Sequence, residues 1–299
     1  MQGKKPLIIV LLGPTASGKT DLAIEIAKKI KVNIHNIDSR QLYKEMDIGT
    51  AKPTLAQQEK INHYLINLRA PNNPITLNEF KKEAEISIQK ELNIKNRSFL
   101  VGGSGLYLKA IIYGLCPPSV PPQPLLREKF KNIGQLECHQ ILQKCDPIAG
   151  GKISQTDAIR TVRALEVFFA TGKKISSLQS LKAPNWTVLE LGLNPSNLHQ
   201  RIAERTKNIY AKGLVEETEQ LVEKYGPELP LLQTIGYKEA LALIEGEYSL
   251  VEAINVTTNR TNQFAKKQRT WFRHQHNAKW LNEKNSLEEA LSLIKNVIG

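Results

Sequence analysis

The stretch GPTASGKT, residues 13–20, constrains the fold of this chain more than any other feature. It has the P-loop spacing G-x-x-x-x-G-K-[ST], and it directly follows an apolar run, residues 7–12, that predicts a buried strand. Apolar residues then recur at helical spacing over residues 22–30. This strand, loop and helix predict an α/β fold with a parallel sheet core of the P-loop NTPase type.

The P-loop also predicts a phosphate site. In such loops backbone N–H groups converge on phosphate oxygens, a lysine bridges those oxygens, and a threonine hydroxyl can hold Mg²⁺. ATP fits this cradle, but a diphosphate fits it as well as the end of a triphosphate does, so the motif alone leaves the ligand open. The predicted phosphate-binding residues are Gly13, Pro14, Thr15, Ala16, Ser17, Gly18, Lys19 and Thr20, with Thr20 as the metal ligand.

The next hundred residues repeat the alternation of strands and helices. Apolar runs predict strands at residues 32–37, 64–68 and 98–101, and Thr76 and Glu79 form a capping box that opens a helix. The last of these strands runs into the glycine-rich turn GGSG, residues 102–105. Since ligands of open α/β sheets bind where the strands end, we expect this turn to lie near the P-loop.

Asp38 follows the second predicted strand. A carboxylate beside a phosphate cradle has three plausible roles: magnesium ligand, general base or helix N-cap. A kinase and a group transferase would both use such an acid, so the residues up to this point do not separate these two classes of enzyme.

A proline-rich connector, PPSVPPQP, begins at residue 117 and predicts a stiff, extended segment that marks a domain boundary. We expect residues 1–120 and 184–299 to form the α/β core with a helical C-terminal part. Residues 121–183 are then a helical insertion, whose best helix places Ala158, Val162, Leu165 and Phe169 on one apolar stripe.

The charge of the chain points to a polyanionic partner. Lys and Arg number 41 against 29 Asp and Glu, which gives a net charge of +12. No acidic residue lies between residues 253 and 282, and a helix there would place Lys266, Arg269 and Arg273 on one face. We favour a stripe that faces phosphates; the alternative is a solvated helix face.

The chain has no pattern of a signal peptide and no apolar run long enough to span a bilayer. Its three cysteines lie far apart and lack the spacing of metal ligands. We therefore expect a cytoplasmic protein with free thiols, and a monomer by default.

Several motifs together resemble the bacterial tRNA dimethylallyltransferases, which are tRNA isopentenyltransferases. The matching stretches cover nearly the whole chain: GPTASGKT, DSRQLYKEMDIGTAKPT, VGGSGLYLKAIIYGL, RALEVF with TGK, and LLQTIGYKEAL. The resemblance implies transfer of a dimethylallyl group from dimethylallyl diphosphate to the exocyclic amine of the adenosine 3′ to the anticodon, in tRNAs that read codons beginning with U. The P-loop would then hold a diphosphate with Mg²⁺, and no nucleoside triphosphate need be hydrolysed.

The resemblance also implies roles for individual residues. Asp38 would act as the general base, while Thr20 and Arg205 would stabilise the leaving diphosphate. The anticodon stem-loop would contact Asp38, Ser39, Arg40, Gln41, Ser104, Ile159, Arg160, Thr161, Val162 and Arg163. The family usually has Thr where this chain has Ser104, but the hydroxyl is kept. Surface helix positions remain the alternative for Arg205, Arg160 and Arg163.

Three other functions remain open at this stage. An adenylate isopentenyltransferase shares the core but modifies a free nucleotide, and the helical insertion with its arginines argues against it. A small-molecule P-loop kinase would turn over ATP without RNA. A non-catalytic RNA-binding protein would keep the P-loop only as part of its fold.

Overall fold

The computed structural model describes residues 5–178 and 180–298, which fall into two compact units. The first unit comprises residues 1–112 and 185–299, and the second comprises residues 113–184. The sequence predicts the boundaries at 120/121 and 183/184. The first boundary lies earlier because β5 (Leu115–Cys116) pairs antiparallel with β6 (Ser180–Leu181), so both connecting segments belong to the second unit.

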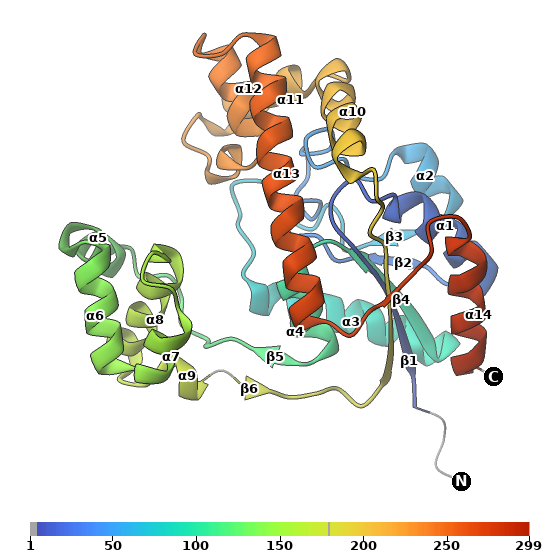
Figure 1. Cartoon of the computed structure of the whole chain (residues 1–299), viewed down its shortest axis with the longest axis horizontal. Helices are drawn as coiled ribbons and strands as arrows, with labels where there is room; N and C mark the ends of the chain where they lie inside the picture. Colours follow the sequence, from blue (N-terminus) through green and yellow to red (C-terminus); the bar gives the residue numbers. More distant parts are fainter. Residues whose placement is uncertain (1–4, 179, 299) are drawn as a thin grey trace. The chain divides into compact units, whose positions relative to one another are not determined.

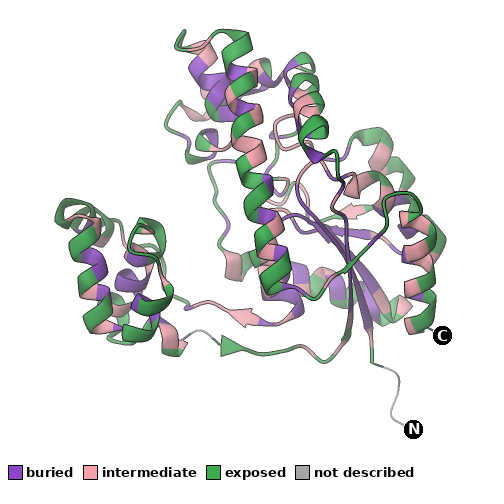
Figure 2. Cartoon of the chain, in the orientation of Figure 1, coloured by how far each residue is buried: buried purple, intermediate pink, exposed green. Residues whose placement is uncertain are grey.

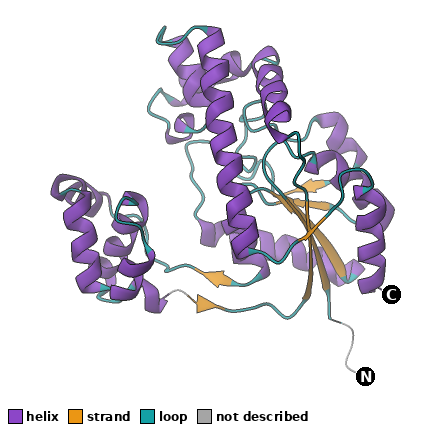
Figure 3. Cartoon of the chain, viewed as in Figure 1, coloured by secondary structure: helices purple, strands orange, loops and turns teal. Residues whose placement is uncertain are grey.

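Within the described residues, a parallel sheet with the strand order β3-β2-β4-β1-β7-β8 forms the centre of the first unit (Figures 1 and 3). Its strands are β1 (Leu7–Leu12), β2 (Ile34–Asn36), β3 (His63–Tyr64), β4 (Arg97–Gly102), β7 (Thr187–Gly192) and β8 (Lys279–Trp280). The parallel α/β core predicted from the P-loop is therefore confirmed.

Helices cover both faces of this sheet. All six residues of β1 are buried (Figure 2). On one face Leu7, Ile9 and Leu11 pack with apolar side chains of α1 (Lys19–Ile30) and α14 (Ser286–Ile298). On the other side lie α3 (Leu77–Lys95), which begins at the predicted capping box, and α4 (Gly105–Ile112) (Figure 1). A strand buried on both faces reads as the continuous apolar run seen in the sequence.

The third strand is shorter than predicted. The apolar run at residues 64–68 contributes only Tyr64 to the sheet, because Leu65 and Asn67 have φ values of 65° and 55°. The N–H groups of Asn67 and Leu68 instead donate to the carbonyls of Gln41 and Leu42. The run thus supports the loop after Asp38 rather than extending the sheet.

The C-terminal half of the first unit is helical. Helix α10 contacts α13 and α11, and α12 packs against both α11 and α13. The remaining elements of this unit are α2 (Leu55–Lys60), α10 (Leu198–Ala211), α11 (Leu214–Tyr225), the 3₁₀ turn η1 (Pro230–Gln233), α12 (Tyr237–Ile244) and α13 (Leu250–Gln275). None of the helices in residues 5–178 and 180–298 is long and apolar enough to cross a membrane.

The second unit has its own small apolar core of side chains from its helices. These are α5 (Pro124–Ile133), α6 (Gln135–Cys145), α7 (Pro147–Lys152), α8 (Ala158–Thr171) and α9 (Ile175–Leu178). The inward face of α8 is rotated from the predicted stripe, since Phe169 is 55% exposed whereas Thr161 and Glu166 are fully buried.

A buried ion network determines this orientation of α8. Glu166 accepts hydrogen bonds from the backbone N–H of Gln123 at 2.6 Å and from Arg127 Nε at 2.7 Å, and it also pairs with Arg163. Burial alone would raise the pKa of Glu166, but these hydrogen bonds lower the pKa to about 2. Glu166 faces inward because cations pair with it there. The spacing of hydrophobic residues cannot predict such a buried glutamate.

Candidate active site

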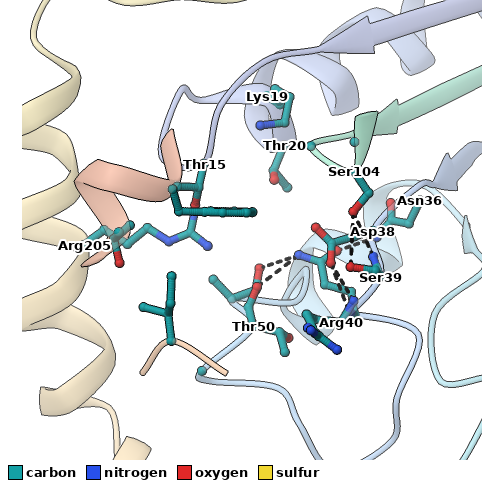
Figure 4. Close-up of a pocket in the computed structure, with 18 of the residues that line it drawn as sticks. Thr15, Lys19, Thr20, Asn36, Asp38, Ser39, Arg40, Thr50, Ser104 and Arg205 are labelled. Carbon is teal, nitrogen blue, oxygen red and sulfur yellow. Dashed lines mark hydrogen bonds between the residues drawn. The ribbon is translucent and has the colours of Figure 1, made fainter. Parts of the chain in front are cut away.

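A cavity of about 460 Å³ lies beside the ends of β2 and β4 and the P-loop (Figure 4). Its polar lining combines three segments that are far apart in the sequence: the P-loop, the stretch after β2 and the glycine-rich turn after β4. Helices α10, α12 and α13 contribute further residues to its wall, as do the loop that contains Gly49 and Thr50 and the segment 233–235. The predicted residues in the lining are Thr15, Lys19, Thr20, Asp38, Ser39, Arg40, Gln41, Ser104 and Arg205.

The backbone of the P-loop turns through two residues in the left-handed region. Ala16 and Gly18 have φ values of 60° and 87°, and α1 begins directly afterwards at Lys19. Gly13 has no room for a side chain, since a Cβ atom there would lie 2.5 Å from the carbonyl oxygen of Leu193. The free N–H groups of the first turn of α1 are thus available to bind an anion.

Three charged groups meet at the cavity: Lys19, Arg205 and Asp38 (Figure 4). Burial lowers the pKa of Lys19 to about 7, Arg205 acts in the same direction, and Asp38 opposes both. Burial also lowers the pKa of Arg205, again against the effect of Asp38. Lys19 Nζ donates to the carbonyl oxygen of Pro14 at 2.7 Å, which holds the ammonium group within the loop. Two cations beside one carboxylate leave an excess of positive charge for an anionic ligand.

Asp38 caps a turn rather than a helix. Its Oδ1 accepts hydrogen bonds from the backbone N–H of Arg40 at 2.8 Å and of Gln41 at 3.3 Å, and residues 39–42 are in turn conformation. The helix N-cap considered for Asp38 is therefore wrong. The carboxylate stays directed at the cavity, where it can accept a proton or help to hold a metal ion.

Ser104 is fixed to the same turn. Its Oγ accepts from the backbone N–H of Ser39 at 3.0 Å and lies 3.4 Å from Ser39 Oγ (Figure 4). On the other side, Gln41 Nε2 donates to the carbonyl oxygens of Thr50 and Ala51. The structure thus brings together the stretch 38–41 and Ser104, as the predicted site requires.

Sequence reasoning missed Glu217, a buried carboxylate of α11 that holds the loop DIGTAK against the cavity. Glu217 accepts from the backbone N–H groups of Asp47, Ile48 and Gly49 at 2.8–3.0 Å and from Tyr237 Oη at 2.6 Å. A Cβ atom on Gly49 would lie 2.4 Å from the Tyr237 ring, so only glycine fits there. No local pattern around Glu217 could have revealed partners this far away along the chain.

Gln268 of α13 was also missed. Its side chain accepts from the backbone N–H of Thr15 at 2.9 Å and donates to the carbonyl oxygen of Gly103 at 2.9 Å. Gln268 lies in a stretch rich in lysine and arginine, and nothing in this local sequence indicates that one glutamine faces the core.

The other predicted tRNA-binding residues, 159–163, lie in the second unit at the start of α8. Ile159 is 85% exposed, and the exposed Arg160 pairs with Asp157 at 3.0 Å. Thr161 is fully buried and Val162 packs against the core of this unit. Arg163 is half-buried; it pairs with Glu166 and donates to the carbonyl oxygen of Val120 at 2.8 Å. Most of the surface that these five residues offer therefore comes from Ile159 and Arg160, and Arg163 adds a smaller part.

The predicted basic stripe lies on α13, as expected for its helical spacing. Lys266 and Arg273 are exposed and Arg269 is half-buried, whereas Phe272 is buried beneath them. Lys266 and Arg273 thus remain on the outer face of the helix, while Gln268 and Phe272 face the core.

The side chains beside the P-loop suit Mg²⁺ that also binds phosphate oxygens better than they suit a metal ion coordinated entirely by the protein. Among the residues that the structure describes, no group of three His, Cys, Asp or Glu side chains could hold a metal ion. Thr20 and Asp38 do line the cavity beside the P-loop. Mg²⁺ usually takes one or two protein oxygens and completes its shell with phosphate oxygens and water, so this donor set fits it.

Comparison with known proteins gives a consistent picture. Residues 41–275 match the model of a family described as IPP transferase. A protein of Prochlorococcus marinus named tRNA dimethylallyltransferase is 71% identical over the full length of both chains, and one of a Synechococcus strain with the same name is 56% identical over 99% of this chain and 96% of its own.

Solved structures extend this likeness to the fold. The tRNA isopentenylpyrophosphate transferase of Staphylococcus epidermidis is 34% identical, with a TM-score of 0.71 over 98% of this chain and 99% of its own. A eukaryotic dimethylallyltransferase, described as acting on tRNA, is 26% identical with a TM-score of 0.81 over 98% of this chain and 79% of its own. The chain therefore belongs to the IPP transferase family, that of the tRNA dimethylallyltransferases.

Proposed function

We propose that the protein transfers a dimethylallyl group from dimethylallyl diphosphate to the exocyclic amine of the adenosine on the 3′ side of the anticodon, in tRNAs that read codons beginning with U. The observation that carries this proposal is one cavity in which a phosphate cradle, a carboxylate and a hydroxyl-bearing glycine-rich turn meet. The cradle suits the diphosphate, and the carboxylate suits an amine that must lose a proton.

The chemistry assigns a role to each group. The amine nitrogen of adenine forms a bond to the first carbon of the prenyl chain, and the bond from that carbon to the diphosphate oxygen breaks with its electron pair. Asp38 takes the proton from the amine, which counteracts the poor nucleophilicity of a nitrogen whose lone pair is delocalised into the ring. Lys19, Arg205 and the amides of the P-loop stabilise the negative charge that grows on the leaving diphosphate.

Thr20 is proposed to hold Mg²⁺ together with the diphosphate oxygens. When bound, the ion would neutralise part of the leaving group's charge. Because a diphosphate fits the P-loop without a nucleoside, the proposal needs no hydrolysis of ATP.

The tRNA is proposed to present the target base unstacked, since its amine is not accessible within the anticodon-loop stack. The turn of residues 38–41 and Ser104 line the cavity that would receive this base. Ile159 and Arg160 of the second unit, and the basic stripe of α13, are proposed to contact the stem-loop and its phosphates. We propose that the enzyme is a monomer, and its tRNA substrate suggests a cytoplasmic location.

The test is to incubate the purified protein with Mg²⁺ and labelled dimethylallyl diphosphate in the presence of unmodified tRNA, free AMP or neither. We expect label in the tRNA alone. Label only in AMP would identify a nucleotide enzyme instead. Turnover of ATP without RNA and no label in either acceptor would identify a kinase.

The charge pattern gives a second prediction, concerning salt. Arg160→Ala should weaken tRNA binding and reduce the slope of log affinity against log salt by about one, as expected for one lost phosphate contact. Binding would be measured by fluorescence anisotropy at several salt concentrations, with the exposed Lys144→Ala of α6 as the control cation. An unchanged slope in Arg160→Ala would contradict the proposed contact.

Arg163→Ala should behave differently from Arg160→Ala because Arg163 holds Glu166 and the connector. Its loss should lower the free energy of unfolding by about 1–3 kcal/mol, since Glu166 loses a partner in a buried site. Thermal unfolding followed by circular dichroism separates this effect from a lost contact with RNA.

A further inference from the structure

Gln268 connects two segments that line the cavity, the P-loop and the glycine-rich turn after β4. Its amide is buried, with 8% of the residue exposed, between the exposed Lys267 and the half-buried Arg269. Its two hydrogen bonds reach the P-loop at Thr15 and the glycine-rich turn at Gly103, both at 2.9 Å. No other side chain described here is shown hydrogen-bonding to both segments.

The polarity of the two partners fixes the orientation of the amide. The N–H of Thr15 is a donor and needs the Oε1 of Gln268, while the carbonyl of Gly103 is an acceptor and needs the Nε2 of Gln268. A glutamate at this position would keep the first bond and direct a negative oxygen at the Gly103 carbonyl. A methionine of similar size would make neither bond.

The glycine-rich turn is in close contact with Gln268 and with the end of the stretch before Asp38. A Cβ atom on Gly103 would lie 2.8 Å from Gln268 Nε2, and one on Gly102 would lie 2.0 Å from the carbonyl oxygen of Ile37. Ser104, the next residue, accepts the N–H of Ser39 beside Asp38. A shift of Gly103 is therefore passed directly to the turn that carries the catalytic carboxylate.

Two more side chains of α13 and its C-terminal end hold the helix against the same turn. The Trp271 ring fills the space above Gly105, where a Cβ atom would lie 2.2 Å away. His276 contacts the carbonyl oxygen of Gly105 at 3.2 Å and Glu190 at 2.7 Å. These contacts fix α13 on the glycine-rich turn, and the hydrogen bond from Thr15 to Gln268 connects α13 to the P-loop as well.

We propose that Gln268 is a positioning residue that couples the diphosphate site to the tRNA site. A diphosphate that orders the P-loop fixes the N–H of Thr15 and hence the Gln268 amide, and this amide in turn fixes Gly103 and the turn of residues 38–41. The second substrate then meets a turn that is already ordered, so the binding of each substrate favours the other. This inference rests on the proposed function, because it assumes that tRNA binds at residues 38–41 and Ser104.

The experiment measures the affinity of unmodified tRNA by fluorescence anisotropy with and without saturating magnesium pyrophosphate. We expect the wild-type protein to bind tRNA at least about fivefold more tightly with pyrophosphate, the lower end of typical coupling between sites. Gln268→Met should bring this ratio close to one. The control, Gln275→Met, removes an exposed amide of the same helix that accepts from Lys109, away from the P-loop, and it should keep the wild-type ratio.

Gln268→Glu keeps the result interpretable if the methionine variant folds poorly. It retains the acceptor for Thr15, and although its negative charge should weaken pyrophosphate binding, the coupling ratio measured at saturating pyrophosphate should still fall towards one. A wild-type ratio near one, or a folded Gln268→Met or Gln268→Glu with the wild-type ratio, would overturn the proposal. Failure of the proposed function shows separately, as absence of labelled tRNA in the transfer assay of the wild-type protein.

Discussion

Asp38→Asn is expected to lower the rate of prenyl transfer to tRNA by about 10²- to 10⁴-fold, the usual contribution of a general base. Asparagine has nearly the same shape, and its Oδ1 can still accept the N–H groups of Arg40 and Gln41, which hold the turn. The amide cannot take a proton from the adenine amine. The loss should therefore fall on the chemical step, measured as the single-turnover rate constant with saturating tRNA and labelled dimethylallyl diphosphate.

The control for a general effect of removing a carboxylate is Asp21→Asn. Asp21 lies exposed in the first turn of α1, where it accepts from Gln57 at 3.1 Å, and it does not line the cavity. Its rate should stay close to that of the wild type. Binding of tRNA to Asp38→Asn should remain within about threefold of the wild type, because the substitution removes proton transfer in the transition state and keeps the contacts of the ground state. Transfer at the wild-type rate by Asp38→Asn would exclude Asp38 as the base.

The strand-loop-helix at residues 7–30 could be predicted from the sequence because its signals are local. A buried parallel strand reads as a continuous apolar run, and the P-loop spacing follows it directly. Asp38 and Ser104 also follow from local position, since strand ends of a parallel sheet meet at one edge. These two residues do lie together in the structure, bridged by Ser39.

The parts that sequence reasoning missed depend on partners that are distant in the chain. Gln268 is 253 residues from Thr15, and Glu217 is 170 residues from Asp47. A single buried polar side chain has no periodicity, so its role is defined only when the fold delivers its partners. The rotated face of α8 has the same origin, because Glu166 is buried by cations from α5 and from its own helix.

Lys19→Met is expected to reduce transfer by about 10²- to 10³-fold, comparable to the loss of one donor from a site that stabilises a leaving anion. The ammonium group is close to its ligand site because the Pro14 carbonyl holds it at 2.7 Å. Methionine keeps the length of the side chain but removes its charge. The decrease should be largest in kcat/KM for dimethylallyl diphosphate, since both binding and departure of the diphosphate lose a cation.

The pH dependence of pyrophosphate binding tests the state of Lys19 itself. Burial lowers the pKa of Lys19 to about 7, so the free enzyme holds a charged lysine below pH 7 and loses this charge as the pH rises. A bound anion favours the charged form, so binding above pH 7 requires uptake of a proton and should weaken by up to about tenfold per pH unit.

Lys19→Arg is the matched variant for this test, because a guanidinium stays charged throughout this range. Pyrophosphate also ionises between pH 6 and 9, but this change acts equally on both proteins. The informative quantity is therefore the ratio of the two dissociation constants, measured by calorimetry from pH 6 to 9. We expect the ratio of wild type to Lys19→Arg to be constant below pH 7 and to rise above it. A constant ratio across the whole range would show that Lys19 keeps its proton and that Asp38 outweighs both burial and Arg205 in setting its charge.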